Sequence, residues 1–166
     1  MAAEGGRGSY TVRRLGARKQ ALLKSGGTLL DMAVAMLETE NMRANYTYGD
    51  GKKGDAANFG IFKQNWLMIR ASLPQYSAYG AADYDVGAAL NGDLNLDVQA
   101  LHASQSHYGL DRWFAGHRNG QSGLSTPNTP DITAYKNAVT WIRDQLTSKA
   151  QYQSDDTRFW VQVHAI

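Results

Sequence analysis

The sequence predicts an α+β fold that is mainly helical, and three observations support this prediction. Apolar residues recur at the spacing of amphipathic helices along most of the chain. One segment, residues 46–55, instead combines β-forming residues with glycine- and aspartate-rich turns. The chain has 166 residues, enough for one domain with its own hydrophobic core, and it shows no internal repeat. We therefore expect helices arranged around a small β element.

The first 27 residues are rich in glycine, arginine and lysine, and we expect a partly flexible N-terminal segment (1–27) packed on the domain. One short helix is predicted near residues 18–24. Because Tyr10 is the only aromatic residue among the basic ones, a solvated surface is favoured over a binding patch. The basic residues are Arg7, Arg13, Arg14, Arg18, Lys19 and Lys24. Residues 28–166 are expected to form a single domain.

The first predicted helix of this domain covers residues 29–39. Thr28 is a suitable N-cap residue, and apolar side chains follow it at helical spacing. Glu38 then falls at the C-terminal end of the helix. The pattern of residues 46–55 predicts a short hairpin or an ordered loop, which carries Asp50.

Helices are also predicted for most of the chain that follows. Asn58 is a possible cap for a buried helix that ends before Pro74. Apolar spacing indicates further helices near residues 83–90, 95–107 and 110–117.

The C-terminal part of the chain is expected to contain one more helix and an extended tail. Pro130 follows a threonine, which is typical of a first helical turn, and an apolar stripe continues from it. Residues 159–163 predict a strand or an extended packing segment. Three tryptophans in apolar stretches are expected in the core, namely Trp66, Trp141 and Trp160.

The composition argues against several classes of function. A net charge of +2 does not produce the cationic field of a nucleic-acid-binding protein. There are no cysteines for disulfides or thiolate chemistry, and no apolar run is long enough for a membrane span. The sequence also contains no nucleotide-binding loop, no nucleophilic serine motif and no metal-binding histidine pair. We expect no cofactor, no metal, and no nucleic-acid or membrane partner.

Two carboxylic residues remain as candidates for chemistry. Glu38 ends a helix beside apolar residues, an environment that disfavours the anion and suits a proton donor. Asp50 lies between glycines and near Lys52 and Lys53, which favour an ionised base or nucleophile. Two carboxyl groups in opposite protonation states are what hydrolysis of a glycosidic bond requires. Taken separately, the two residues would more often be a surface carboxylate and a turn residue.

Neighbouring carboxylates offer alternatives for both roles. Glu40 lies two residues after Glu38, so only one of them can face a given side of a helix. Glu38 is favoured because it lies on the less polar side. Asp55 is the alternative to Asp50 as the base, or a group that orients a nearby lysine.

The order of these residues resembles that of a known enzyme superfamily. A helix-end Glu38, an aromatic segment with Asp50 and the run NFGIFKQN at residues 58–65 resemble the lysozyme superfamily. More specifically, MLETENM at residues 36–42 followed by YTYGD at residues 46–50 is similar to glycoside hydrolase family 134. Members of this family are endo-β-1,4-mannanases with a lysozyme-like fold. The resemblance is close over about residues 31–70, with weaker support from residues 113–120.

This resemblance implies a lysozyme-like catalytic domain over residues 28–166 with an open substrate cleft. The implied reaction is endo-acting hydrolysis of β-1,4-mannan with inversion of the anomeric configuration. Glu38 would be the general acid and Asp50 the general base. The implied partners are β-mannan and manno-oligosaccharides, and we expect a secreted monomer whose signal peptide is absent from this sequence.

Polysaccharide clefts stack sugar rings on aromatic side chains and bind hydroxyls with amide and charged groups. Residues of these types near the two carboxylates are candidates for substrate binding. They are Tyr46, Tyr48, Asp55, Asn58, Lys63, Asn65, His107, Trp113, His117, Arg118 and Asn119. For His107, His117 and Trp113, a purely structural role is equally compatible with the sequence.

Other functions remain open at this point. Within the same class, the substrate could be chitosan, chitin or peptidoglycan. A carbohydrate-binding module without catalysis would keep the aromatic residues and need neither carboxylate. A structural or inhibitor protein on the same scaffold is a further alternative, because a fold does not fix a function.

Overall fold

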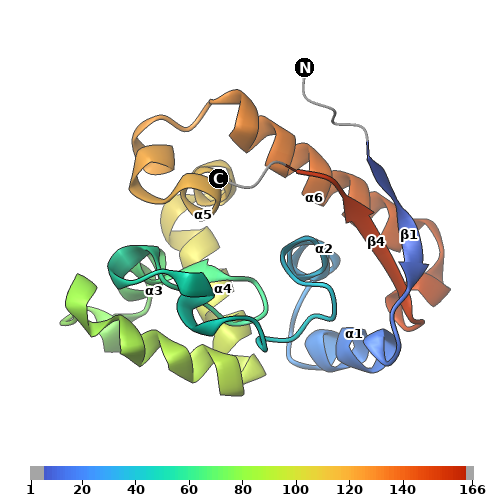
Figure 1. Cartoon of the computed structure of the whole chain (residues 1–166), viewed down its shortest axis with the longest axis horizontal. Coiled ribbons are helices and arrows are strands. Elements are labelled where there is room, and N and C mark those ends of the chain that lie inside the picture. Colours follow the sequence, from blue (N-terminus) through green and yellow to red (C-terminus); the bar gives the residue numbers. More distant parts are fainter. Residues whose placement is uncertain (1–5, 164–166) are drawn as a thin grey trace.

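The computed structural model describes residues 6–163, which form a mainly helical structure with two short antiparallel pairs of strands (Figure 1). This confirms the predicted α+β, mainly α fold class. Residues 1–5 of the expected N-terminal segment lie outside the described residues. With η for 3-10 helices, the elements are β1 (Arg7–Thr11), α1 (Leu15–Lys24), α2 (Leu29–Glu38), η1 (Tyr48–Gly51), η2 (Gly54–Ala56), β2 (Asn58–Phe59), β3 (Gln64–Asn65), α3 (Trp66–Ser72), η3 (Pro74–Tyr76), η4 (Ala81–Gly92), α4 (Leu94–Tyr108), α5 (Leu110–Ser125), α6 (Pro130–Ser148), η5 (Ala150–Gln153) and β4 (Thr157–Val161).

Helix α2 is the central helix of the structure, and it ends at Glu38. The Thr28 hydroxyl accepts a hydrogen bond from the backbone N–H of Asp31 at 3.1 Å, and the Asp31 carboxylate accepts one from the backbone N–H of Thr28 at 2.9 Å. This reciprocal capping fixes the start of the helix. Residues 32–36 are completely buried, and α1, α6 and β4 pack against α2. The helix predicted over residues 29–39 is confirmed.

The N-terminal segment contains a strand that the sequence pattern did not predict. Strand β1 pairs with β4, near the other end of the chain, so that Gly8 lies opposite Trp160. This pairing also shows that the segment expected to be extended at residues 159–163 is largely a strand. Helix α1 follows β1 and includes the short helix predicted near residues 18–24.

Lys19 was expected on a solvated surface, and the structure corrects this expectation. Its side chain is fully buried, although Arg7, Arg13, Arg14 and Lys24 are exposed. The Lys19 ammonium group donates hydrogen bonds to the carbonyl oxygens of Tyr152 and Thr157, both at 2.7 Å. It also lies 3.4 Å from the Asp155 carboxylate. These oxygen atoms replace the water that a buried ammonium group loses.

Residues 46–55 were predicted to form either a short hairpin or an ordered loop, and the structure shows the ordered loop. It forms the 3-10 turns η1 and η2. Gly49, Asp50 and Gly51 have φ angles of 63°, 59° and 73°. Three successive left-handed residues cannot continue a strand, because a strand requires negative φ. The hairpin lies later in the chain, where β2 pairs with β3.

The position of this hairpin also corrects the predicted start of the next helix. Asn58 pairs with Asn65 in the hairpin, and it does not cap a helix. Between the two strands, Gly60 and Lys63 have φ angles of 79° and 49°, which turn the chain back. Asn65 is the actual cap of α3, which ends before Pro74 as predicted.

The later helices agree with the predictions in position, with two differences. The segment predicted near residues 83–90 is the 3-10 helix η4. Helix α5 continues beyond residue 117 to Ser125, and it has a sharp kink at Gly120, with φ 60° and ψ −139°. This backbone conformation is accessible essentially to glycine alone. None of the helices within residues 6–163 combines the length and the apolar character that crossing a membrane requires.

The hydrophobic core has two parts. The larger part surrounds α2 and includes residues of α1, α6 and β4. The smaller part lies among the hairpin, α3, η4 and α4, and it contains Phe59 and Trp66. Helix α4 contributes to both, since Leu101 belongs to the larger part and Ala100 to the smaller. The two parts are therefore joined through a shared helix.

The three tryptophans expected in the core have different positions. Trp66 is completely buried, which confirms the expectation. Trp141 is partly buried and packs edge-on against Phe159, with ring centroids 6.1 Å apart. The expectation is wrong for Trp160. Side chains alternate along β4, and Phe159 and Val161 contact the core, so Trp160 lies on the outer side of the ribbon.

Candidate active site

A cleft of about 490 Å³ lies at the C-terminal end of α2. Both predicted carboxylates, Glu38 and Asp50, line it, although they come from different parts of the molecule. Its walls come from the loop and hairpin of residues 50–65, from α5 and from α6. The lining residues are Glu38, Asp50, Lys52, Asp55, Ala56, Asn58, Lys63, Asn65, His117, Arg118, Asn119, Gly120, Ser122, Tyr135 and Val163. The fold thus brings together two acidic side chains that are 12 positions apart in the sequence.

Glu38 contacts two buried side chains through one carboxyl oxygen. The Tyr135 hydroxyl donates a hydrogen bond to Oε2 of Glu38 at 2.9 Å, and Nε2 of His117 lies 2.8 Å from the same oxygen. The side chain of His117 is 1% exposed, whereas that of Glu38 is 21% exposed. Burial, together with the charge of Glu38, raises the pKa of Tyr135 well above its ordinary value, so the hydroxyl stays a donor. These two contacts leave Oε1 of Glu38 available to a substrate.

The partners of Glu38 are themselves held in place by aromatic packing. The His117 ring stacks on Trp113, with ring centroids 4.7 Å apart and an angle of 16° between the ring planes. Trp113 is 1% exposed and Tyr135 is 3% exposed. Because His117 and Tyr135 come from α5 and α6, the packing of these two helices fixes the orientation of the Glu38 carboxyl group.

Asp50 has a different, charged environment. The Lys63 ammonium group lies 3.2 Å from Oδ1 of Asp50, and the Asn58 side chain donates a hydrogen bond to Oδ2 at 3.1 Å. The Asp50 side chain is 28% exposed, so water reaches it. A cation and an amide donor therefore each contact one oxygen of the Asp50 carboxylate.

Tyr46 holds the lysine that contacts Asp50. Its hydroxyl donates a hydrogen bond to the backbone carbonyl of Gly60 at 2.6 Å, and the Lys63 ammonium group lies 4.8 Å from the centroid of its ring. Burial raises the pKa of Tyr46 above its ordinary value, and the charges of nearby carboxylates, including Asp50 and Glu38, add to this effect. Tyr46 does not line the cleft itself, but it contacts Gly60 and Lys63 of the hairpin that does.

The alternative carboxylates have contacts that separate them from the central pair. Both oxygens of Asp55 accept hydrogen bonds from the Arg70 guanidinium, at 2.8 and 2.9 Å. Asp55 lines the cleft, but this bidentate pair occupies its carboxylate. Glu40 is exposed and accepts a hydrogen bond from the Tyr10 hydroxyl at 3.2 Å, and it does not line the cleft.

The kink of α5 determines where its predicted site residues lie. His117, Arg118 and Asn119 precede the kink at Gly120, and all four residues line the cleft. The Asn119 side chain donates a hydrogen bond to Asp131 at 2.8 Å. The Arg118 guanidinium lies 5.9 Å from the centroid of the Tyr135 ring. Within residues 6–163, no group of three or more acidic or histidine side chains is arranged to hold a metal ion.

Asn65 lines the cleft, but most of its hydrogen-bonding capacity is used by the protein. It is buried, and its side-chain amide donates to the backbone carbonyl of Gly116 at 3.0 Å. Its side-chain oxygen accepts a hydrogen bond from the backbone N–H of Met68 at 3.0 Å. Asn65 therefore connects the hairpin, α3 and α5.

Four of the predicted substrate-binding residues do not line the cleft: Tyr46, Tyr48, His107 and Trp113. Tyr48 is 52% exposed and donates a hydrogen bond to Asp85 at 2.6 Å. His107 is exposed near the end of α4, and its ring packs edge-on against Tyr108. Trp113 is buried beneath His117, so it acts on the cleft only through that side chain.

Tyr135 is the most informative cleft residue that the sequence did not reveal as such. In the sequence it is one member of the apolar stripe of α6, and a tyrosine in such a stripe cannot be distinguished from a core residue. Lys52, Ser122 and Val163 also line the cleft and were not predicted as site residues. A tyrosine hydroxyl on an otherwise apolar helix face is a signal that a buried polar partner exists, because a buried hydroxyl needs one.

A cleft that holds two carboxyl groups in different environments is the arrangement by which glycosidic bonds are hydrolysed. The fold and the site thus belong to the class of glycoside hydrolases. Residues 16–163, nearly the whole chain, match glycosyl hydrolase family 134, and the chain belongs to this family. A comparison with curated protein sequences finds no significant match.

Proposed function

We propose that this glycoside hydrolase is an endo-acting β-1,4-mannanase that inverts the anomeric configuration. Glu38 is the general acid that protonates the leaving oxygen, and Asp50 is the general base that activates water. The observation that carries this proposal is the difference between the two carboxylates of one cleft. Glu38 contacts buried aromatic side chains, whereas Asp50 contacts a lysine and an amide.

The contacts of Glu38 support a role as proton donor. Tyr135 and His117 both bind Oε2, so the proton to be transferred sits on Oε1. When Glu38 releases this proton to the glycosidic oxygen, it becomes an anion. The Tyr135 hydroxyl then stabilises the new charge, because a hydrogen bond to a charged acceptor is stronger than one to a neutral acceptor.

The contacts of Asp50 support a role as base. Lys63 and Asn58 each contact one oxygen of its carboxylate, which suits a group that acts as a base. A water molecule held by this carboxylate can attack the anomeric carbon as Glu38 protonates the leaving group. In this single displacement the water adds to the face opposite the leaving oxygen, which inverts the anomeric configuration.

The proposed substrate rests on similarity to the family and on the chemistry of the cleft. The motifs at residues 36–42 and 46–50 are similar to those of endo-β-1,4-mannanases. Asn58, Asn119 and Lys52 provide amide and ammonium groups that can bind sugar hydroxyls. We also propose a secreted enzyme that acts as a monomer.

Proton NMR of mannohexaose digestion tests the reaction. We expect the α-anomer to be formed first, because inversion at a β-linkage gives an α-product. Glu38→Gln and Asp50→Asn should each reduce the rate about 100-fold or more, since a positioned acid or base contributes 10²–10⁴-fold. Asp55→Asn serves as a comparison and should retain more activity than Asp50→Asn.

Three results would contradict the proposal in different ways. Early formation of mostly β-anomer would exclude inversion. Full activity of Glu38→Gln would exclude this residue as the acid. If the enzyme hydrolysed chitosan or peptidoglycan but not linear mannan, the proposed catalytic roles would stand and the proposed substrate would be wrong.

A further inference from the structure

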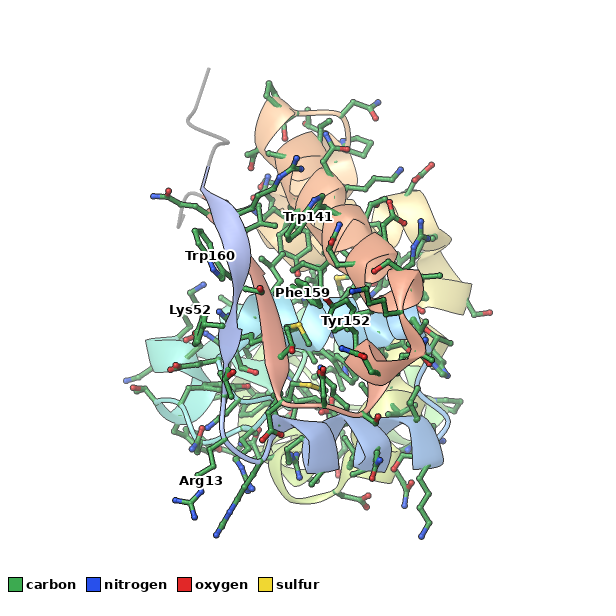
Figure 2. All side chains as sticks on the ribbon, turned by 90° about the vertical axis from the view of Figure 1, so that its right-hand side faces the viewer. Arg13, Lys52, Trp141, Tyr152, Phe159 and Trp160 are labelled. Atoms are coloured by element: carbon green, nitrogen blue, oxygen red, sulfur yellow. The ribbon has the colours of Figure 1, made fainter. Side chains whose placement is uncertain are left out.

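Trp160 lies on the outer face of the β1–β4 ribbon, outside the catalytic cleft. Its neighbours in β4, Phe159 and Val161, contact the core, so the indole is on the opposite face. Figure 2 shows Trp160 on the outer side of the ribbon, away from Phe159. Trp160 is only partly buried, although it is one of the largest side chains in the protein.

Gly8 of β1 and Gly6, which precedes this strand, provide the surface on which the indole rests. Gly8 pairs with Trp160 in the register. A Cβ atom added at Gly8 would lie 3.2, 3.3 and 3.4 Å from three adjacent indole atoms, Nε1, Cζ2 and Cε2. These distances show that the backbone at Gly8 lies directly against the indole. A Cβ at Gly6 would likewise lie 3.2 Å from Cζ3 of the ring.

This arrangement orients the tryptophan as a platform. The glycine backbone supports the indole from one side, and the ring remains partly exposed for contact with a ligand. A larger residue at position 8 would shift the ring, because even its Cβ would lie closer to the indole than is usual for such contacts. A flat, supported aromatic ring is the group that stacks on the C–H face of a sugar.

The platform is continuous with the cleft along the chain. Val163 lines the cleft, and it is three residues after Trp160. Three residues of extended chain span at most about 10 Å, so the platform and the cleft wall are close neighbours. Lys52, another lining residue, is on the same side of the molecule as Trp160 in Figure 2.

Polar side chains next to Trp160 fit a ligand with many hydroxyl groups. Gln162, the residue after β4, is exposed, and its side chain and the Trp160 ring both lie next to Gly6. Tyr10 is 42% exposed and lies on this face too, but its hydroxyl is engaged by Glu40 and Arg158. An amide beside an indole is a typical arrangement for binding neutral sugars.

We propose that Trp160, supported by Gly6 and Gly8 and flanked by Gln162, is a secondary binding site for polymeric substrate. Its ligand is a run of neutral β-linked hexose units that extends beyond the cleft at the Val163 end. This inference rests on the proposed hydrolysis of mannan. The site holds the polymer and takes no part in bond cleavage.

Kinetics on a long and a short substrate test this site. Trp160→Ala is compared with the wild type on linear β-1,4-mannan and on mannohexaose. We expect the KM for the polymer to rise about three- to tenfold, the effect of losing one stacking contact. The kcat/KM for mannohexaose should stay within about twofold, because a short substrate occupies the cleft alone.

Control variants distinguish stacking from a change in folding. Trp160→Phe keeps an aromatic ring and should restore most of the affinity for the polymer. Tyr79→Ala removes another exposed aromatic side chain, 40% exposed and outside the cleft lining, and should leave both substrates unaffected. Gly8→Val should resemble Trp160→Ala, because its side chain displaces the indole.

A parallel binding assay keeps the inference separate from the proposed reaction. Sedimentation with insoluble mannan compares Glu38→Gln with the double variant Glu38→Gln and Trp160→Ala. Weaker binding by the double variant supports the site even if the wild type fails to cleave mannohexaose, a failure that would overturn the proposed function alone. An equal loss of activity on mannan and on mannohexaose would overturn the secondary site. Unchanged activity on both substrates, together with unchanged sedimentation with mannan, would overturn it as well.

Discussion

At the scale of single residues, the cleft is organised by what each carboxylate contacts. Glu38 is bound on one oxygen by Tyr135 and His117, and Asp50 is bound by Lys63 and Asn58. The first environment is aromatic, whereas the second contains a cation. Two chemically similar groups therefore have different partners within one cleft.

Tyr135 is expected to act through Glu38, and Tyr135→Phe tests this role. The variant removes only the hydroxyl that donates to Oε2 of Glu38. We expect kcat to fall about 10- to 100-fold with little change in KM, because the lost hydrogen bond strengthens only as Glu38 becomes an anion. Steady-state kinetics on mannohexaose provides the measurement.

A matched tyrosine provides the control for this variant. Tyr152 is only partly buried, packs against Phe159 and does not line the cleft. Tyr152→Phe should keep the wild-type kcat. If Tyr135→Phe raises KM and leaves kcat unchanged, Tyr135 binds sugar and does not position the acid.

At the scale of elements, contacts between distant parts of the chain hold the walls of the cleft. Strand β1 pairs with β4, and the buried Lys19 of α1 bonds to carbonyl groups of η5 and β4. The hairpin is joined to α5 by Asn65 and to α4 by Asp97. Because β4 leads directly to Val163 in the cleft, the N-terminal elements help to position the end of the chain.

Lys19→Met should destabilise the protein, although it removes a charge from the interior. Methionine fills a similar volume, but it leaves the carbonyl groups of Tyr152 and Thr157 without their donor. We expect the free energy of unfolding to fall by about 2–4 kcal/mol, the usual cost of unsatisfied buried acceptors. Urea denaturation measures this change.

Lys24→Met on the same helix is the control, since Lys24 is exposed. It should change the free energy of unfolding by less than about 0.5 kcal/mol, as surface substitutions usually do. If Lys19→Met were as stable as the wild type, the Lys19 ammonium group would make no net contribution to the free energy of unfolding.

At the scale of the whole molecule, one buried carboxyl group links the hairpin to α4, the helix shared by both parts of the core. Asp97 accepts hydrogen bonds from the backbone N–H of Ile61 at 2.7 Å and from the Gln64 side chain at 2.8 Å. A Cβ at Gly60 would lie only 2.2 Å from Oδ1 of Asp97, so this turn requires glycine. The position of the hairpin, and with it of Lys63, depends on this contact.

The stability of the protein should depend on pH through Asp97. Burial raises the pKa of Asp97 to about 7, while the hydrogen bonds from Ile61 and Gln64 oppose this rise. The folded chain therefore holds the proton more tightly than the unfolded chain, whose aspartate has a pKa near 3.9. The stabilising contribution of this protonation is complete below about pH 4 and is lost as the pH rises through about 7.

Comparison with Asp97→Asn isolates this effect, because asparagine does not titrate. The free energy of unfolding of the wild type relative to Asp97→Asn should decrease between pH 4 and pH 7, by at most about 1.4 kcal/mol per pH unit. Urea denaturation at several pH values measures it. A difference that stays constant, or grows with pH, would show that the hydrogen bonds outweigh burial.

The sequence by itself determined the features that depend on local chemistry. Thr28 and the apolar spacing after it placed α2 and put Glu38 at its end, and Pro130 marked the start of α6. The pattern around Glu38 and Asp50 was enough to predict the family, which the match over residues 16–163 confirms. Local rules suffice here because capping and amphipathic spacing involve residues within a few positions of one another.

The tertiary structure decided which residues meet across the chain. No local pattern indicated that Tyr135 would bond to Glu38, that Lys19 would be buried, or that Trp160 would face outward. Each outcome depends on a partner far away in the sequence: α6 for Glu38, the β4 region for Lys19 and β1 for Trp160. The physical reason is that the burial and pairing of a side chain depend on the surface packed against it, which the chain acquires only when it folds.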